Sequence, residues 1–329
     1  MALLDVEDLK VSLRTSRGMA QAVRGVSFQL ERGDTMGLIG ESGSGKSITA
    51  LSLLGLLPEG AKVEGHIRLD GRELVGRPEA ELCKIRGNRI AFVFQEPMTA
   101  LNPVHTIGRQ VAEPMTIHRC ITHGAARAEV IRLLDRVGLP DASKRVDAYP
   151  HQLSGGQRQR VTIAMALACG PDILIADEPT TALDVTIQNQ ILDLIGELVA
   201  ESGMALILIS HDLGVIAENA ARMMVMYGGS VVESGPTAEV FRHMGHPYSQ
   251  GLFAARPKLG APRGEQLKTI PGTVPELADL PTGCPFSDRC GLVIDACRTT
   301  PPPAMPVGPD HVARCIRLDV ALANMAVAR

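Results

Sequence analysis

The sequence predicts an α/β fold with one large domain and an appendage, or two domains, and three observations lead there. A continuous apolar strand at Met36–Ile39 precedes a glycine-rich loop and a helix from Ser47 through Leu57, which is how a parallel α/β core begins. Further apolar strands at 173–176 and 205–209 flank a helix that is apolar on one face. The 329 residues, 45% of them apolar, are enough to bury such a core.

The other segments are expected to add to this core. Residues 1–35 alternate between apolar and polar, which predicts antiparallel strands. Residues from about 97 to 168 are expected to be helical, and short strands are expected near Met223–Met226 and Ser230–Glu233. Beyond about Leu259, prolines are so frequent that an extended appendage with little helix or sheet is expected.

The composition excludes several classes of function. The 33 basic and 36 acidic residues leave a net charge of −3, which gives no electrostatic footprint for nucleic acid. No apolar run approaches the ~20 residues that a membrane-spanning helix needs. The N-terminus carries Asp5, Glu7 and Asp8 where a signal peptide would have basic and then apolar residues. We therefore expect a cytoplasmic protein that contacts a membrane only through a partner.

A phosphate-binding loop is indicated by Gly40–Ser47, which reads Gly-Glu-Ser-Gly-Ser-Gly-Lys-Ser between a strand and a helix. Its glycines let backbone N–H groups turn inward around phosphate oxygens, at the positive end of a helix dipole. Lys46 is expected to reach the β- and γ-phosphates, and the Ser47 hydroxyl to hold Mg²⁺. The residues expected to contact the nucleotide here are Gly40, Ser42, Gly43, Ser44, Gly45, Lys46 and Ser47.

Two carboxylates follow the apolar strand at residues 173–176. Asp177 is placed to orient Mg²⁺ through water, and Glu178 to polarise the attacking water as a general base. Such a pair alone is typical of a solvated strand end. Together with the phosphate-binding loop, it predicts hydrolysis of the nucleotide rather than binding alone.

A second loop, Leu-Ser-Gly-Gly-Gln at residues 153–157, identifies the class, because it forms another anion-binding helix start. Residues 1–250 resemble the ABC-type ATPases. The resemblance implies an ABC nucleotide-binding domain of the P-loop NTPase fold, with a RecA-like core, an antiparallel β subdomain and a helical subdomain at about 97–168. It implies that this signature loop closes on the nucleotide held by a partner's P-loop, through Ser154, Gly155, Gly156 and Gln157.

Three further motifs follow in the order of that family. Gln95 resembles the Q-loop residue that contacts Mg²⁺ and the membrane subunit, and Asp184 lies in a segment, Ala182–Asp184, that resembles the D-loop. His211 resembles the switch histidine at the γ-phosphate. The resemblance implies catalytic roles for Glu178, His211 and Gln95, nucleotide contacts for Gln95, Asp177 and Asp184, and Mg²⁺ contacts for Ser47, Gln95 and Asp177.

The chain departs from the family in one respect, at the residue that usually stacks on adenine. ABC ATPases place an aromatic residue in the stretch before the P-loop, and this chain has none there. An arginine plane is expected to substitute as the stacking surface, with loose selectivity for the base. The stretch contains Arg14, Thr15, Ser16, Arg17 and Met19.

The chain also resembles the dipeptide and oligopeptide importer ATPases of bacteria almost end to end. The stretches that carry this resemblance are 40–47, 97–103, 149–156, 176–184, 246–248 and 284–290. The resemblance implies an ATPase domain at residues 1–258 and an importer-type C-terminal extension at residues 259–329.

That resemblance implies a peripheral subunit on the cytoplasmic face of the inner membrane, which hydrolyses ATP with Mg²⁺ to import peptides. The implied partners are a second ABC ATPase subunit, identical or related, two membrane permease subunits and a periplasmic solute-binding protein, with no nucleic acid. The alternatives are import of nickel or another small solute, and a soluble ABC ATPase that acts on nucleic acid.

Four of the seven cysteines lie in the proline-rich tail, at Cys284, Cys290, Cys297 and Cys315. Four thiolates can bind a 4Fe–4S cluster or Zn²⁺. Their spacing is wider than the Cys-x2–4-Cys pairs of zinc sites, which favours the cluster, and zinc or unligated thiols stay open as alternatives. A redox-sensing tail that gates the ATPase is a further hypothesis. The remaining cysteines are interpreted as isolated thiols, with Cys169 buried: Cys83, Cys120 and Cys169.

Overall fold

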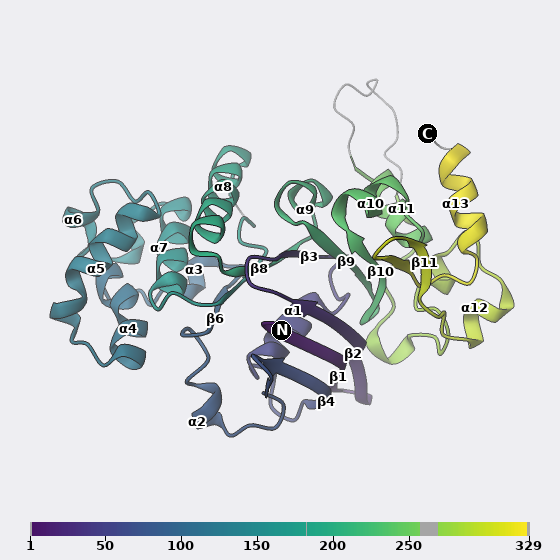
Figure 1. Cartoon of the computed structure of the whole chain (residues 1–329), viewed down its shortest axis with the longest axis horizontal. Helices are drawn as coiled ribbons and strands as arrows, with labels where there is room; N and C mark the ends of the chain where they lie inside the picture. The colour runs from purple at the N-terminus through teal and green to yellow at the C-terminus, as the bar shows by residue number, and fades with distance from the viewer. Residues whose placement is uncertain (1, 182, 257–268, 328–329) are drawn as a thin grey trace. The chain divides into compact units, whose positions relative to one another are not determined.

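The computed structural model describes residues 2–181, 183–256 and 269–327 (Figure 1). The chain divides into two compact units. The first contains residues 76–209 with two short N-terminal segments, and the second contains residues 36–75, 210 onward and most of the first 29 residues. Among the described residues, no helix is both long enough and apolar enough to cross a membrane.

The first unit contains a parallel set of strands and the helical region. Its strands pair in the order β6-β7-β8, and Ile173 lies opposite both Ile90 and Ala205. All residues of β7 and β8 are buried, as expected for parallel strands that are covered on both faces. The strands are β6 (Ile90–Val93), β7 (Ile173–Asp177) and β8 (Ala205–Ser210).

The helical region of this unit confirms the prediction for residues 97–168. Helices α4, α5 and α7 pack on one another, and the side chains of Thr106 and Thr122 cap the starts of α4 and α5. The helices are α2 (Glu79–Leu82), α3 (Pro97–Ala100), α4 (Ile107–Arg119), α5 (His123–Arg136), α6 (Ala142–Arg145), the 3-10 helix η1 (Pro150–Gln152), α7 (Gly155–Leu167) and α8 (Val185–Ser202).

The second unit contains an antiparallel sheet from the N-terminal part of the chain, as the alternation of residues 1–35 predicted. Its strand order is β2-β1-β4-β5, and β1, β2 and β4 lie side by side in Figure 1. A two-residue turn at Ser16 and Arg17 joins β1 to β2. The strands are β1 (Leu4–Thr15), β2 (Gly18–Leu30), β4 (Lys62–Leu69) and β5 (Arg72–Glu73).

A second set of strands in this unit carries the phosphate-binding loop. β3 pairs with β9 in parallel, and β9, β10, β12 and β11 continue the set in antiparallel pairs. The strands are β3 (Thr35–Ile39), β9 (Arg222–Tyr227), β10 (Ser230–Pro236), β11 (Met305–Gly308) and β12 (His311–Ala313). The helices are α1 (Lys46–Leu53), α9 (Leu213–Asn219), α10 (Thr237–Arg242), α11 (Pro247–Ala254), η2 (Leu277–Asp279), η3 (Ser287–Arg289), α12 (Asp295–Thr299) and α13 (Leu318–Val327).

Two expectations about local structure are wrong. The helix after the phosphate loop ends at Leu53 rather than Leu57, because Gly55 takes a left-handed φ of 62° and Pro58 follows. The tail is also not simply extended. Residues 305–313 form a hairpin that pairs with β10, and the proline-free stretch Leu318–Val327 is helical.

A buried carboxylate ties this tail to the rest of the unit. The Glu233 side chain in β10 is fully buried and accepts hydrogen bonds from the backbone N–H groups of Gly245 (2.6 Å) and His246 (3.1 Å). The ring nitrogen Nε2 of His311 in β12 lies 2.9 Å from the same carboxylate. A buried carboxyl group needs such hydrogen-bond partners, so Glu233 fixes the position of the tail hairpin.

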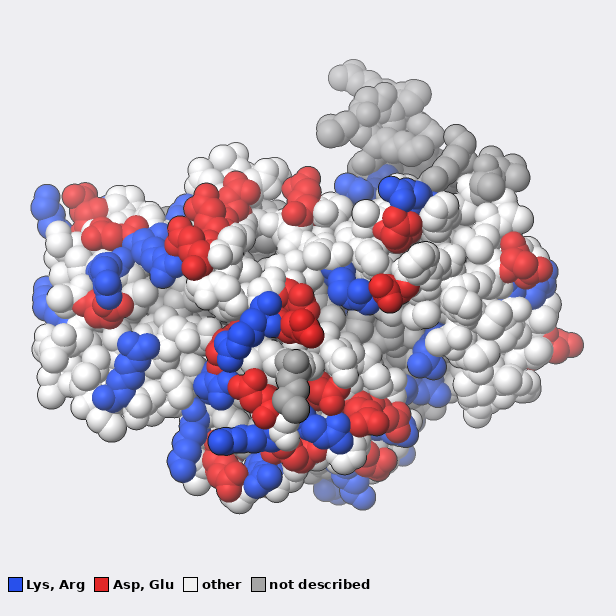
Figure 2. Space-filling model, viewed as in Figure 1, with Lys and Arg blue, Asp and Glu red and all other residues white. Residues whose placement is uncertain are grey.

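Charges are mixed on the surface. Figure 2 shows basic and acidic side chains interspersed over the face in view, in keeping with the net charge of −3.

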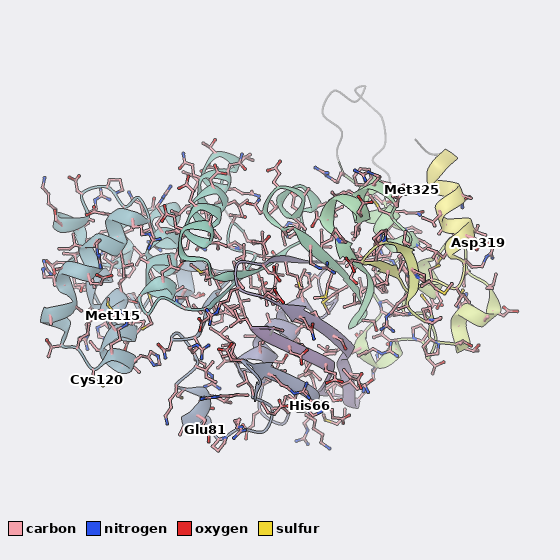
Figure 3. The ribbon with its side chains drawn as sticks, in the orientation of Figure 1. His66, Glu81, Met115, Cys120, Asp319 and Met325 are labelled. Carbon is pink, nitrogen blue, oxygen red and sulfur yellow. The ribbon has the colours of Figure 1, made fainter. Side chains whose placement is uncertain are left out.

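Cys120 caps the C-terminal end of α4 in the left-handed conformation, and its side chain is exposed (Figure 3).

Candidate nucleotide site

The phosphate-binding loop connects β3 to α1 and needs glycine at specific positions. Gly40 and Gly45 have φ values of 156° and 101°. A Cβ atom on Gly40 would lie 2.2 Å from the backbone oxygen of Met226, and one on Gly45 would lie 2.8 Å from that of Ala22. Gly45 caps α1 without a side-chain hydrogen bond, so the helix start is lined by backbone N–H groups that suit an anion.

Lys46 is buried and folds back onto this loop. Its ammonium Nζ donates to the carbonyl oxygens of Gly40 at 2.7 Å and Glu41 at 3.1 Å. These carbonyls hold the positive charge at the loop in the way that phosphate oxygens are expected to hold it in a nucleotide complex. The ammonium group therefore lies at the loop, where it can interact with phosphate oxygens.

The second residue of the loop, Glu41, is held by the C-terminal part of the chain. Its carboxylate accepts two hydrogen bonds from the Arg289 guanidinium, at 2.6 and 3.1 Å, and its backbone N–H donates to the Tyr248 hydroxyl at 2.8 Å. Only 5% of the Arg289 side chain is exposed, and its Nε donates to the Pro271 carbonyl at 2.8 Å. The hydrogen bond to Glu41 raises the pKa of Arg289, so this guanidinium stays charged.

The sequence analysis did not predict this contact. A single arginine in a proline-rich tail gives no pattern that would pair it with a residue 248 positions earlier. The two tyrosines that surround the pair, Tyr227 and Tyr248, are fully buried and stack edge to face. The C-terminal part of the chain therefore packs against the phosphate-binding loop and holds Glu41 in place.

The predicted carboxylates lie at the end of β7. Asp177 is 7% exposed, and Glu178 follows it with a φ of 46°, a conformation that is rare for residues other than glycine. The Glu178 N–H donates to the carbonyl of Ile209, which fixes the turn. Its Oε2 accepts from Gln95 Nε2 at 3.1 Å and from Thr181 Oγ1 at 3.0 Å. The structure thus brings Gln95 and Glu178 together.

The signature loop starts α7 with reciprocal hydrogen bonds. The Ser154 hydroxyl accepts from the Gln157 N–H at 3.3 Å, and Gln157 Oε1 accepts from the Ser154 N–H at 3.1 Å. A Cβ on Gly156 would lie 2.8 Å from Cγ2 of Ile187 in α8. Gly156 therefore also has a packing role, which the sequence analysis did not predict.

Two remaining motif residues lie at other helix starts. Asp184 caps α8 by accepting from the Ile187 N–H at 3.0 Å, while Ala182 lies outside the described residues. His211 is exposed just after β8, beside Asp212, which caps α9. The phosphate loop and His211 belong to one compact unit, and Gln95, the strand-end carboxylates and the signature loop belong to the other.

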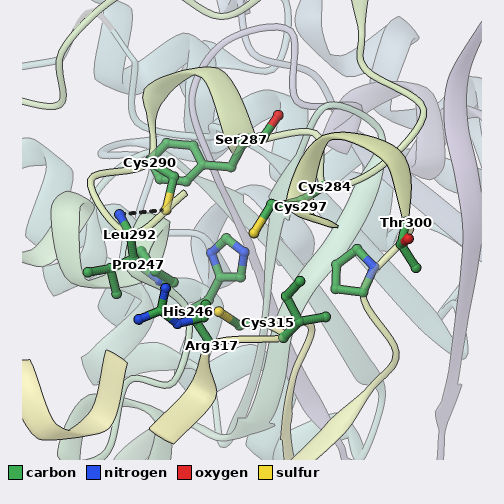
Figure 4. Close-up of a pocket in the computed structure, with 13 residues that line it drawn as sticks. His246, Pro247, Cys284, Ser287, Cys290, Leu292, Cys297, Thr300, Cys315 and Arg317 are labelled. Carbon is green, nitrogen blue, oxygen red and sulfur yellow. Dashed lines mark hydrogen bonds between the residues drawn. The ribbon is translucent and has the colours of Figure 1, made fainter. Parts of the chain in front are cut away.

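The four tail cysteines line one cavity together with His246 (Figure 4). Its free volume is about 20 Å³, room for about one water molecule. Among the described residues, no group of three or more His, Cys, Asp or Glu side chains is arranged to hold a metal ion. The four cysteines lie around one cavity, as their clustering in the sequence suggested. Their side chains are not arranged as the predicted ligands of a cluster or of zinc.

The hydrogen-bond donors around the cysteine sulfur atoms suit a bound metal group, whereas the small free volume of the cavity does not. The Leu292 N–H donates to Cys290 Sγ at 3.4 Å, and backbone N–H groups likewise favour the thiolates of Cys284 and Cys315. Burial nevertheless raises the pKa of Cys284 to about 12 and also raises those of Cys290 and Cys315. Neutral thiols are thus favoured without a metal, whereas the N–H donors suit metal-bound sulfur.

Comparison with known proteins gives two family matches. Residues 23–181 match the ABC transporter model, and residues 232–297 match the model of the oligopeptide/dipeptide transporter C-terminal region. A peptide import ATP-binding protein of Brucella ovis is 51% identical over 327 residues, covering 96% of this chain and 97% of its own. The oligopeptide transport ATP-binding protein OppD of Haemophilus influenzae is 50% identical, covering 91% and 92%.

Solved structures agree with these matches. A dimeric, post-hydrolysis structure of an ATP-binding cassette with ADP and phosphate bound superposes with a TM-score of 0.63 at 28% identity, covering 71% of this chain and 98% of that one. A cassette from Clostridium perfringens, part of an ABC transporter complex, has a TM-score of 0.62 at 28% identity, covering 73% and 91%.

Proposed function

Because this chain belongs to the ATP-binding subunits of ABC transporters, we propose that it is the ATPase of a bacterial importer of di- and oligopeptides. The observation that carries the proposal is the presence of both family matches in one chain, at residues 23–181 and 232–297. The second match supports a peptide cargo over nickel or another small solute. We assign the ATPase domain to residues 1–258 and the importer-type extension to residues 259–329.

Nucleotide binding is assigned to two surfaces of the subunit. The backbone of residues 40–45 and the Lys46 ammonium bind the phosphates, since the loop leads into the N-terminus of α1 and carries a buried cation. The signature loop, Ser154–Gln157, binds the γ-phosphate held by a partner subunit. Mg²⁺ neutralises phosphate charge when bound, and the oxygen donors that suit it are those of Ser47, Gln95 and Asp177.

Hydrolysis is assigned to Glu178 as the general base. Gln95 and Thr181 both donate to its Oε2, so the carboxylate is oriented to accept a proton from a water molecule. His211 is assigned to the γ-phosphate, and Asp184 to the contact between the two ATPase subunits. ATP binding would close the dimer and hydrolysis would reopen it, which drives the membrane subunits.

Partners follow from this assignment. We propose two permease subunits, a solute-binding protein and a second ATPase subunit, identical or related, at the cytoplasmic face of the inner membrane. Phe94, directly before Gln95, and Val104, further along the same segment, expose apolar side chains at 47% and 71%, which supports a docking surface for the permease.

The substitution Glu178→Gln tests the catalytic assignment. The substitution removes the general base but keeps a side-chain oxygen that can accept hydrogen bonds from Gln95 and Thr181. Steady-state ATPase activity should therefore fall by at least about 100-fold, and ATP should trap a closed dimer. Glu197→Gln, an exposed carboxylate on α8, is the matched control and should keep full activity. Undiminished turnover in Glu178→Gln would contradict the assignment.

The class of function has its own test. ATPase activity should rise when the permease and a peptide-loaded binding protein are supplied in vesicles, and should not respond to DNA or RNA. Stimulation by nucleic acid alone would favour the alternative of a soluble ABC ATPase. Stimulation by nickel but not by peptides would keep the mechanism and change the cargo.

For the cysteine cavity we propose a 4Fe–4S cluster held by Cys284, Cys290, Cys297 and Cys315, whose binding would require the cavity to widen from its free volume of about 20 Å³. Bound there, the cluster would supply a structural staple for the tail, whose own core is small. The four thiols lining one cavity, with backbone N–H donors beside three of them, support this choice. Anaerobic purification should give about four irons and four sulfides per chain. One zinc per chain, or no metal, would favour the two alternatives.

A further inference from the structure

A pocket of about 330 Å³ lies next to the phosphate loop and is lined by three segments. They are the β1–β2 turn at residues 15–17, the loop residues 42 and 43, and residues 274–278 of the C-terminal extension. All three segments belong to the same compact unit. The volume lies in the range of small-molecule sites.

The extension contributes the apolar side of this pocket. Val274, Pro275 and Leu277 are half-buried and line it, and Val274 and Pro275 belong to no helix or strand. Apolar side chains of this kind can pack against the face of an aromatic ring. The position beside Ser42 and Gly43 places this surface next to the residues assigned to the phosphates.

Arg17, in the β1–β2 turn, also lines the pocket, and two hydrogen bonds to the extension fix its position. Arg17 Nη1 donates to Asp279 Oδ1 at 2.7 Å, and Nη2 donates to Glu276 Oε2 at 3.0 Å. The Arg17 side chain is 54% exposed, so these pairs add little to stability. Two carboxylates on one guanidinium do orient its plane, and a guanidinium plane stacks well on aromatic rings.

We propose that residues 274–279 of the extension and Arg17 form the base-binding pocket of this ATPase. The base lies between the Arg17 guanidinium and the apolar side chains of Val274, Pro275 and Leu277, while the phosphate loop holds the triphosphate. This inference rests on the proposed ATPase function and supplies what replaces the missing aromatic residue. It makes the extension a direct contributor to nucleotide affinity.

Comparing the binding of two ligands separates the contribution of the base from that of the phosphates. Dissociation constants for Mg-ATP and for inorganic tripolyphosphate would be measured for the full chain and for Arg17→Ala and Leu277→Ala. Loss of a stacking partner should weaken ATP binding by about 5- to 30-fold, with tripolyphosphate affinity unchanged. Arg72→Ala, which removes an exposed arginine in β5 outside the pocket, is the control and should change neither.

The two acidic residues are positioning residues, and a mutant cycle tests them. The double substitution Glu276→Ala and Asp279→Ala should weaken ATP binding by a few-fold when Arg17 is present. It should weaken ATP binding no further when it is added to the Arg17→Ala variant. Unchanged tripolyphosphate binding shows that each variant is folded.

Each outcome has a distinct meaning. If the unmodified chain binds neither ATP nor tripolyphosphate, the proposed function fails. If it binds both, yet Arg17→Ala and Leu277→Ala alter ATP binding no more than Arg72→Ala does, the base-pocket assignment is overturned. Equal weakening of both ligands would also overturn it, because the effect would then lie on the phosphates.

Discussion

The bridge between Arg289 and Glu41 predicts that a single change in the tail destabilises the phosphate loop. Arg289→Ala removes the guanidinium and leaves the Glu41 carboxylate without its two donors. Breaking a buried charge pair costs about 3–5 kcal/mol. Since Glu41 is 31% exposed, solvent screens part of this charge, and we expect a loss of about 2–3 kcal/mol in the free energy of unfolding.

Urea unfolding of the full chain, with and without Mg-ATP, measures this loss. The matched control is Arg298→Ala, whose ion pair with Asp288 lies in the same extension but is 51% exposed on both sides. It should change the unfolding free energy by at most about 0.5 kcal/mol. Arg289→Lys keeps the charge but not the two-pronged geometry, and should fall between the two.

The refuting result is specific. If Arg289→Ala costs no more than Arg298→Ala, the bridge contributes nothing to the loop. If Arg289→Ala is costly and adding Glu41→Ala does not reduce the cost, the energy comes from the Pro271 and Tyr227 contacts of Arg289 instead.

Three further predictions follow from packing, burial and the base pocket. Gly156→Ala should force α7 away from Ile187, cost about 1–3 kcal/mol and lower ATPase activity, and adding Ile187→Ala should restore part of the stability in urea unfolding. A thiol reagent at pH 8 should label exposed Cys83 and Cys120 quickly and Cys169 only after unfolding, because burial raises the pKa of Cys169; equal rates, read by mass spectrometry, would contradict this. GTP should compete with ATP within about tenfold, since stacking discriminates poorly among bases; a much larger preference in a competition assay would indicate polar contacts to the base.

The sequence predicted the parts of the fold that local pattern determines. The strand, loop and helix around Gly40–Ser47, the buried strands 173–177 and 205–210, and the helices between 97 and 167 follow from apolar periodicity and glycine placement. The family resemblance added the order of the motifs. The meeting of Gln95 and Glu178 was implied by their assigned roles rather than by the spacing of the residues.

The sequence did not predict the contacts that depend on distant pairing. Proline content correctly indicated little regular structure between about 271 and 303, where the helices η2, η3 and α12 are at most five residues long, but it could not show that His311–Ala313 would add to β10. That pairing depends on a buried carboxylate at Glu233, which no local pattern marks as buried. Likewise, the pocket formed by Arg17 and residues 274–278 joins segments about 260 residues apart.

The clamp on Glu41 also has a consequence for how the protein is made. A ribosome synthesises the phosphate loop early and Arg289 248 residues later, with Tyr248 in between. Domains generally fold as units during synthesis, starting from the N-terminus. The hydrogen bonds from Arg289 to Glu41 therefore cannot form until the ribosome has synthesised the chain past Arg289.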